Sequence, residues 1–84
     1  MSRLQIATLL GFVSEQDGRF WNESGTMGVH VNDDQTITLL DSDGVSSNHA
    51  LALDHAQHIL NRARQYGDDE GATMRRWDNY ASSI

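Results

Sequence analysis

The segment from Leu53 to Gly67 (LDHAQHILNRARQYG) constrains the fold most, because it contains the start, the period and the end of one helix. Asp54 is a residue type that caps helices, and Gln57 three residues later completes a capping box. Gly67 is the glycine expected just beyond the last turn. The apolar residues between them recur at the spacing of a single helix face: Ala56, Ile59, Leu60 and Ala63. We therefore predict one main amphipathic helix over residues 54–66, which needs a sheet to cover.

The middle of the chain carries the turn signals of antiparallel strands. Asp17-Gly18 predicts a hairpin turn that leads into a strand over residues 19–21. Two further strands are expected over residues 27–32 and 36–41, on either side of a polar turn. Asp41-Ser42-Asp43-Gly44 then marks the next turn.

The alternation of apolar residues sets the register of the second hairpin. The apolar residues of the two strands share a core face only if Val31 lies opposite Ile37. This pairing requires a loop with an odd number of residues, either 33–35 or 32–36. A two-residue loop would place Val31 opposite Thr36 and divide the core, so we predict the odd loop.

Two segments fit more than one structure. A helix is favoured for residues 3–10, because Ser2 and Gln5 match a capping box and Gly11 can end the helix. Several residues of this segment also favour strands. For residues 45–53 the alternating pattern slightly favours a strand over a helix, although alanine and leucine are strong helix formers.

Together these patterns predict an α+β fold, with a small antiparallel sheet of three to four strands packed on the main helix (54–66). Short helices at the N- and C-terminal ends are compatible with the pattern. Residues 1–67 are expected to form a single α+β domain. Residues 68–84 are expected to be an acidic linker followed by a C-terminal segment. That segment is either a short helix over 72–81 that docks on the domain or a tail that orders on a partner.

The charge of the chain argues against direct binding to nucleic acid. Twelve acidic residues face six basic ones, all of them Arg, for a formal net charge of −6 at pH 7. Affinity for a phosphate backbone comes from clustered cations, so no nucleic-acid binding is expected. An acidic surface favours encounter with basic proteins, which include nucleic-acid-binding ones; alternatively, the charge serves solubility alone.

The sequence also lacks the features of exported, membrane-spanning and disulfide-bonded proteins. No apolar run is long enough for a signal peptide or a transmembrane span, which predicts a cytoplasmic location and no contact with membranes. There is no Cys, so neither a disulfide nor a thiolate zinc site can form.

No motif for metal binding or catalysis is present. His55 and His58 lie one helical turn apart and are near His49 in sequence, but they lack the HExxH spacing and any cysteine partner. Residues 41–44 resemble the opening of a calcium-binding loop, but Ser46 stands where that loop requires Gly. No spacing marks a catalytic triad. We predict no catalytic residue, no metal site and no cofactor, and therefore no enzymatic activity.

The aromatic residues favour a protein interface. Phe20 and Trp21 are consecutive on a predicted strand, so one points into the core and the other out of it. Trp77 and Tyr80 lie outside the main helix–sheet unit. Trp77 either folds back to complete the core or remains exposed, as interface anchors often are. With the paired carboxylates, the candidate partner-binding residues are Trp21, Asp33, Asp34, Asp68, Asp69, Trp77 and Tyr80.

In overall character the chain resembles the small acidic accessory proteins of bacteriophages and mobile elements, which include anti-CRISPR inhibitors. The shared features are short length, acidity, the absence of Cys and of catalytic motifs, and a small sheet with one or two helices. This resemblance assigns no role to any single residue. It implies a non-enzymatic inhibitor in the host cytoplasm that occupies a basic, nucleic-acid-binding site on a host defence protein such as a CRISPR–Cas complex.

The alternative is a homodimeric structural or assembly module without an inhibitory role. Clustering of carboxylates on one side of the molecule would favour the inhibitor; the residues concerned are Asp33, Asp34, Asp41, Asp43, Asp68, Asp69 and Glu70. Scattered carboxylates, together with an apolar two-fold contact, would favour the module.

Overall fold

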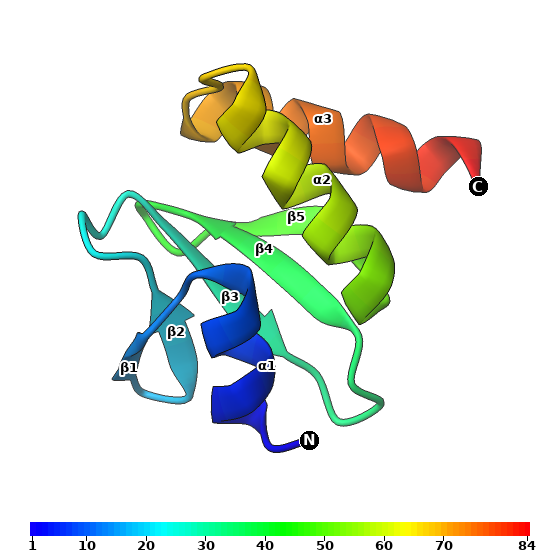
Figure 1. Ribbon diagram of the computed structural model, residues 1–84. Coiled ribbons are helices and arrows are strands. Elements are labelled where there is room, and N and C mark those ends of the chain that lie inside the picture. Colours follow the sequence, from blue (N-terminus) through cyan, green and yellow to red (C-terminus); the bar gives the residue numbers. More distant parts are fainter.

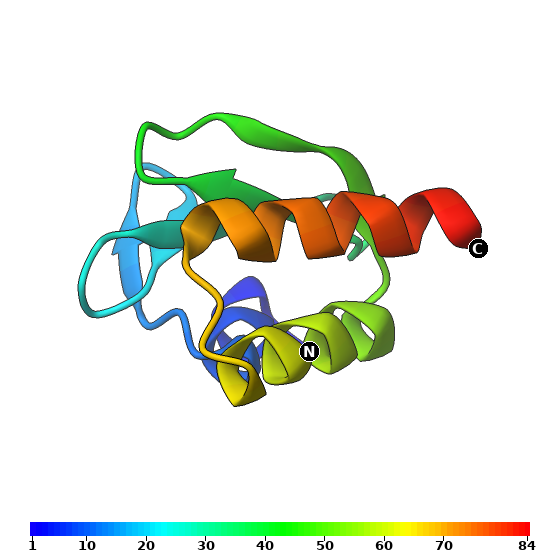
Figure 2. The same cartoon turned by 90° about the horizontal axis from the view of Figure 1, so that it is seen from above.

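The chain forms a five-stranded sheet with three helices on one side of it. In a computed structural model that describes residues 1–84, the elements are α1 (Arg3–Leu10), β1 (Ser14–Gln16), β2 (Arg19–Trp21), β3 (Met27–Val31), β4 (Ile37–Asp41), β5 (Ser46–Leu51), α2 (Leu53–Gln65) and α3 (Glu70–Ser83). The strands are antiparallel and lie in the order β1-β2-β3-β4-β5. Figures 1 and 2 show the helices together on one side of the sheet. The predicted α+β class is confirmed, with more strands than the three or four expected.

Helix α1 forms because both of its ends carry capping residues. Ser2 Oγ accepts a hydrogen bond from the Gln5 backbone N–H at 3.1 Å, and Gln5 Oε1 accepts one from the Ser2 N–H at 2.8 Å. This is the predicted capping box. The helix ends at Gly11, whose φ of 95° is a left-handed conformation that favours glycine. The helix favoured for residues 3–10 is confirmed.

The register of the central hairpin is the one that the apolar alternation requires. Val31 pairs with Ile37, and the loop between them spans residues 32–36, so the predicted odd loop is confirmed. The first hairpin turns at Asp17 and Gly18, whose φ angles of 55° and 80° fit a two-residue hairpin turn.

Helix α2 begins one residue earlier than predicted. The preceding segment is strand β5, the favoured alternative, and it ends at Leu51. Ala52 is then the N-cap and offers no side-chain hydrogen bond. Asp54 lies inside the first turn, where its carboxylate accepts a hydrogen bond from the His55 N–H at 2.9 Å. The predicted capping box of Asp54 and Gln57 is wrong, because the end of β5 determines where the helix starts.

The C-terminal end of α2 agrees with the prediction. Gly67 has a φ of 67°. The Asp68 N–H donates to the Ala63 carbonyl at 2.9 Å and the Gly67 N–H donates to the Arg64 carbonyl at 3.2 Å, which is the pattern of a glycine-ended helix. The apolar face of α2 is buried as expected: Ala56, Ile59, Leu60 and Ala63.

Helix α3 packs on the sheet and shares its core. Asp69 is the N-cap and accepts a hydrogen bond from the Ala72 N–H at 2.8 Å. The helix therefore begins at Glu70, inside the segment expected to be a linker, and is longer than predicted. It contacts β4, β5 and α2. Fourteen buried residues form one apolar cluster: Ile6, Ala7, Leu10, Phe12, Phe20, Val29, Val31, Ile37, Leu39, Leu51, Ala56, Ile59, Leu60 and Trp77.

None of the three helices is both long enough and apolar enough to cross a membrane.

Candidate protein-binding site

The two predicted pairs of carboxylates lie at opposite ends of the molecule. Asp33 and Asp34 are in the turn between β3 and β4, whereas Asp68 and Asp69 connect α2 to α3 (Figure 1). Asp33 forms an ion pair with Arg3 Nη2 at 2.6 Å, and both side chains are exposed. The four carboxylates therefore do not form one surface.

Asp34 has a local role in the turn. Its carboxylate accepts hydrogen bonds from the Thr36 hydroxyl at 2.6 Å and from the Thr36 N–H at 3.0 Å. These bonds favour the charged form and lower the pKa of Asp34 below its ordinary value, the hydroxyl contributing most.

Trp77 is a core residue and not a surface residue. Its side chain is 0% exposed, and its Nε1 donates to the carbonyl of His49 in β5 at 3.0 Å. The fifth strand extends the sheet beyond the area that α2 covers, and Trp77 fills the space beneath α3. The prediction that Trp77 is an exposed interface anchor is wrong. The alternative, that Trp77 folds back to complete the core, is correct.

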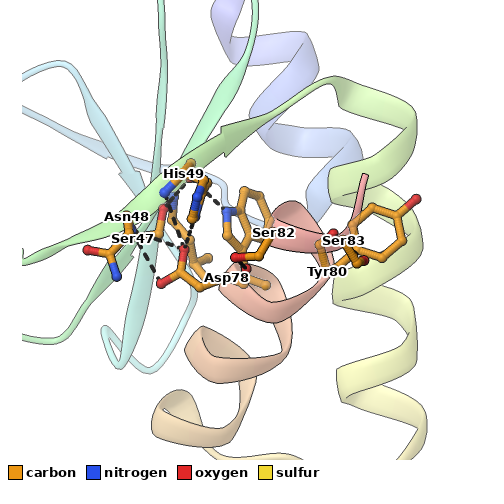
Figure 3. A network of polar contacts seen from close by, with 9 residues as sticks. Ser47, Asn48, His49, Asp78, Tyr80, Ser82 and Ser83 are labelled. Atoms are coloured by element: carbon orange, nitrogen blue, oxygen red, sulfur yellow. Dashed lines mark hydrogen bonds and ion pairs between the residues drawn. The ribbon is translucent and has the colours of Figure 1, made fainter.

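The polar contacts around Asp78 attach α3 to β5 (Figure 3). The Asp78 carboxylate accepts from the N–H groups of Asn48 at 3.0 Å and His49 at 3.2 Å, and lies 3.3 Å from His49 Nδ1. The neighbouring hydroxyls are engaged elsewhere: Ser47 Oγ donates to the His49 carbonyl at 2.7 Å and Ser82 Oγ to the Asp78 carbonyl at 2.8 Å. This His–Asp pair therefore joins α3 to β5.

Tyr80 joins α3 to α2 through the two helical histidines. Its hydroxyl is hydrogen-bonded to His55 Nδ1, and its ring lies 6.0 Å from the ring of His58. Tyr80 is only partly buried. No three His, Cys, Asp or Glu side chains lie close enough together to hold a metal ion.

Six of the twelve acidic side chains gather at one end of the molecule, which we call the acidic end. Three segments meet there: the β2–β3 loop, the β4–β5 turn and the α2–α3 connection with the first turn of α3 (Figure 1). Glu70 ties two of them together, because its carboxylate accepts from both the N–H and the hydroxyl of Ser42 at 3.2 Å. The six residues are Glu23, Asp41, Asp43, Asp68, Asp69 and Glu70.

A cleft of about 430 Å³ opens at the acidic end. Its floor is apolar and belongs to the core, and its rim is polar and acidic. The lining residues of the floor are Phe12, Met27, Leu60, Ala63 and Thr73, and those of the rim are Asn22, Thr26, Arg64, Asp68, Asp69 and Glu70.

Two arginines balance part of the negative charge around this cleft. Arg76 Nε donates to Asp68 at 2.7 Å, and this bond raises the pKa of Arg76 above its ordinary value. Arg64 donates to the Leu10 carbonyl at the end of α1 and lies 5.8 Å from the centre of the Phe12 ring. Burial lowers the pKa of Arg64.

Trp21 borders the acidic end from the uncovered face of the sheet. Its ring lies flat against Gly28, where a Cβ would come within 2.7 Å of the ring. A shallow depression joins Trp21 to Glu23 and Ser42. Trp21 is partly exposed, and its neighbour Phe20 is 5% exposed, so the predicted alternation of the two is confirmed.

Of the seven predicted partner-binding residues, Asp68 and Asp69 line the cleft, whereas Trp21 lies at the same end on the uncovered face of the sheet. Sequence reasoning missed Glu70 as a site residue, although the run Asp68-Asp69-Glu70 was a signal for it. The floor had no signal, because its residues come from four separate segments of the chain.

Comparison with protein-family models, with curated proteins and with solved structures gave no match. The functional argument therefore depends on the geometry of this chain.

Proposed function

We propose that this protein is a non-enzymatic inhibitor that binds the basic, nucleic-acid-binding site of a partner protein through its acidic end. The observation that carries the proposal is a cleft whose rim holds the carboxylates of Asp68, Asp69 and Glu70, at the end of the molecule where the loops that carry Glu23, Asp41 and Asp43 also lie. Of the carboxylates whose clustering would favour an inhibitor over an assembly module, Asp41, Asp43, Asp68, Asp69 and Glu70 lie at this end. Asp33 and Asp34 lie outside the proposed surface.

The physical basis is electrostatic steering followed by local anchoring. Charges of one sign on one end of a protein accelerate encounter with a surface of the opposite sign. Exposed charge pairs alone add little affinity, so tight binding also needs apolar anchors that exclude water. Met27 in the cleft and Trp21 on the uncovered face of the sheet supply partly exposed apolar surface at this end of the molecule.

The proposal is tested with immobilised protein in a nuclease-treated lysate of the host cell. The bait with Asp69→Asn and Glu70→Gln loses two charges at the acidic end, and the bait with Asp33→Asn and Asp34→Asn loses two at the opposite end. Both pairs of substitutions are isosteric, and Asn remains an N-cap residue for α3. We expect wild type and the opposite-end variant to retain a nucleic-acid-binding protein that the acidic-end variant loses.

Association with the captured protein is then measured on a biosensor at increasing salt. We expect the association rate constant to fall as salt rises, because steering is screened beyond about 8–10 Å near physiological ionic strength. Equal capture by both variants, or an association rate that does not depend on salt, would contradict the proposal.

A second candidate function is a homodimeric assembly module, and the outer surface of α1 favours it. Leu4 and Leu9 are 54% and 53% exposed, and the nearby Met1 and Val13 are 65% and 59% exposed. Light scattering coupled to gel filtration distinguishes the two. A dimer that Leu4→Ser and Leu9→Ser convert to a monomer supports the module, and a wild-type monomer at all concentrations removes this candidate.

A further inference from the structure

We infer that the cleft at the acidic end receives a single arginine side chain from the partner protein. This inference rests on the proposed function and names the group that anchors the interface. The aliphatic stem of the arginine lies on the apolar floor, and its guanidinium reaches the carboxylates of Asp69 and Glu70.

The size and lining of the cleft suit one long side chain with a polar tip. A volume of about 430 Å³ lies at the lower end of the range for small-ligand pockets. The floor residues Phe12, Leu60 and Thr73 are at most 2% exposed, so they belong to the packed core and themselves present little surface to an incoming group. Met27 is partly buried beside them and offers a flexible apolar surface.

The two carboxylates at the rim form no ion pair within the protein, although Arg75 Nη1 and Asp69 Oδ1 lie 3.5 and 3.6 Å from the position that a Cβ would take at Gly71. The ion pairs of the protein are Arg3–Asp33, His49–Asp78 and Arg76–Asp68. The hydrogen-bond donors to Asp69 and Glu70 are neutral: the Ala72 N–H for Asp69, and the N–H and hydroxyl of Ser42 for Glu70. Each carboxylate accepts further hydrogen bonds through its remaining lone pairs.

Helix ends also favour a cation at this position. The C-terminal turn of α2 lines the cleft with Ala63 and Arg64, and helix C-termini carry partial negative charge; α1 ends nearby, two residues before Phe12. The N-terminus of α3 has the opposite sign, but Asp69 and Glu70 offset it. Arg64 already uses one of these ends, since its guanidinium donates to the Leu10 carbonyl beside the Phe12 ring. The partner's guanidinium must therefore lie on the α3 side, away from Arg64.

Arginine fits this site better than lysine. The planar guanidinium presents five N–H donors in a fixed fork and can address two carboxylates at once. It is also more weakly hydrated than an ammonium group, so it loses less on entering a cleft with an apolar floor.

The test is a titration of isotope-labelled protein with L-argininamide, followed by amide chemical shifts in NMR spectra at constant ionic strength. L-citrullinamide, which has nearly the same shape without the charge, and L-lysinamide are the comparison probes. We expect saturable shifts at Met27, Ala63 and Thr73 with argininamide, weaker ones with lysinamide and none with citrullinamide.

Matched variants locate the charge that the probe needs. Asp69→Asn with Glu70→Gln should weaken argininamide binding about three- to tenfold, as expected for two partly exposed ion pairs. Asp33→Asn with Asp34→Asn should leave it unchanged. Equal shifts from citrullinamide, shifts outside the cleft, or binding that the acidic-end substitutions do not weaken would each overturn the inference.

The outcomes separate this inference from the proposed function. Argininamide binding in the cleft, without capture of a nucleic-acid-binding protein, supports the arginine site and refutes the function. Capture that depends on Asp69 and Glu70, without argininamide binding in the cleft, supports the function and refutes the arginine anchor.

Discussion

Substitution of Trp77 tests whether α3 is part of the core or an appendage to residues 1–67. The side chain is 0% exposed and bonds to the His49 carbonyl of β5. Burial of ~150–250 Å² of aromatic surface, at ~25 cal/mol per Å², contributes about 4–6 kcal/mol. Measured costs of replacing buried aromatic residues with Ala are about 3–5 kcal/mol. We therefore expect Trp77→Ala to lower the free energy of unfolding by about 4 kcal/mol.

That loss is large for a chain of this length. At about 0.05–0.15 kcal/mol per residue, the whole protein is stable by about 4–13 kcal/mol, so Trp77→Ala removes a large part of the total. Trp77→Phe keeps most of the apolar area and loses the hydrogen bond to His49. We expect it to cost about 1–2 kcal/mol and to lower Tm by about 4–16 °C.

Urea unfolding followed by far-ultraviolet circular dichroism measures these costs. Tyr66→Ala is the matched control, because Tyr66 is an aromatic residue that is 59% exposed, and its removal should cost about 1 kcal/mol or less. A truncated chain of residues 1–67 should fail to fold. Equal midpoints for Trp77→Ala and Tyr66→Ala, or cooperative unfolding of the truncated chain, would refute the reasoning.

Four further predictions concern local features. Gly28→Ala places a Cβ within 2.7 Å of the Trp21 ring; we expect a loss of about 1–3 kcal/mol and altered Trp fluorescence, and unchanged values would contradict this. The hydrogen bonds that lower the pKa of Asp34 stabilise the fold at pH values above the unfolded-state pKa. This stabilisation is lost as pH falls through the folded-state pKa. Asp34→Asn should therefore show a shallower acid-side loss of stability than wild type, and superimposable curves would argue against it. Asp54→Ala should cost less than about 1 kcal/mol, because Asp54 is not the N-cap and contributes only the helix-dipole interaction and the bond from the His55 N–H; a loss of about 2 kcal/mol would indicate a cap. Zinc added to chelator-treated protein should leave Tm unchanged, and a rise that His55→Ala abolishes would reveal a metal site.

Local signals in the sequence were sufficient for most elements. The capping box at Ser2 and Gln5 identifies α1, and the pairing of Val31 with Ile37 follows from alternation alone. The start of α2 did not follow in the same way. Asp54 has the chemistry of a cap, but β5 ends at Leu51 and places it inside the first turn. The tertiary position of the preceding strand overrides the local capping preference and determines where the helix begins.

The candidate site was only partly predictable because it depends on which loops meet. Nothing in the sequence shows that the β3–β4 turn lies far from the α2–α3 connection. The sequence alone therefore could not show that Asp33 and Asp69 lie at opposite ends of the molecule. The burial of Trp77 depends on a fifth strand that extends the sheet under α3. The cleft requires contact between segments that are far apart in the sequence, and such a long-range arrangement has no period or spacing in the sequence.

Displacement of nucleic acid tests the central claim most directly. The partner protein retained by the bait is loaded with its fluorescently labelled RNA or DNA, and anisotropy is followed as this protein is added. We predict stoichiometric release of the nucleic acid by wild type and by Asp33→Asn with Asp34→Asn, and much weaker release by Asp69→Asn with Glu70→Gln. Formation of a ternary complex with unchanged anisotropy, or direct binding of the labelled nucleic acid by this protein alone at physiological salt, would contradict the account.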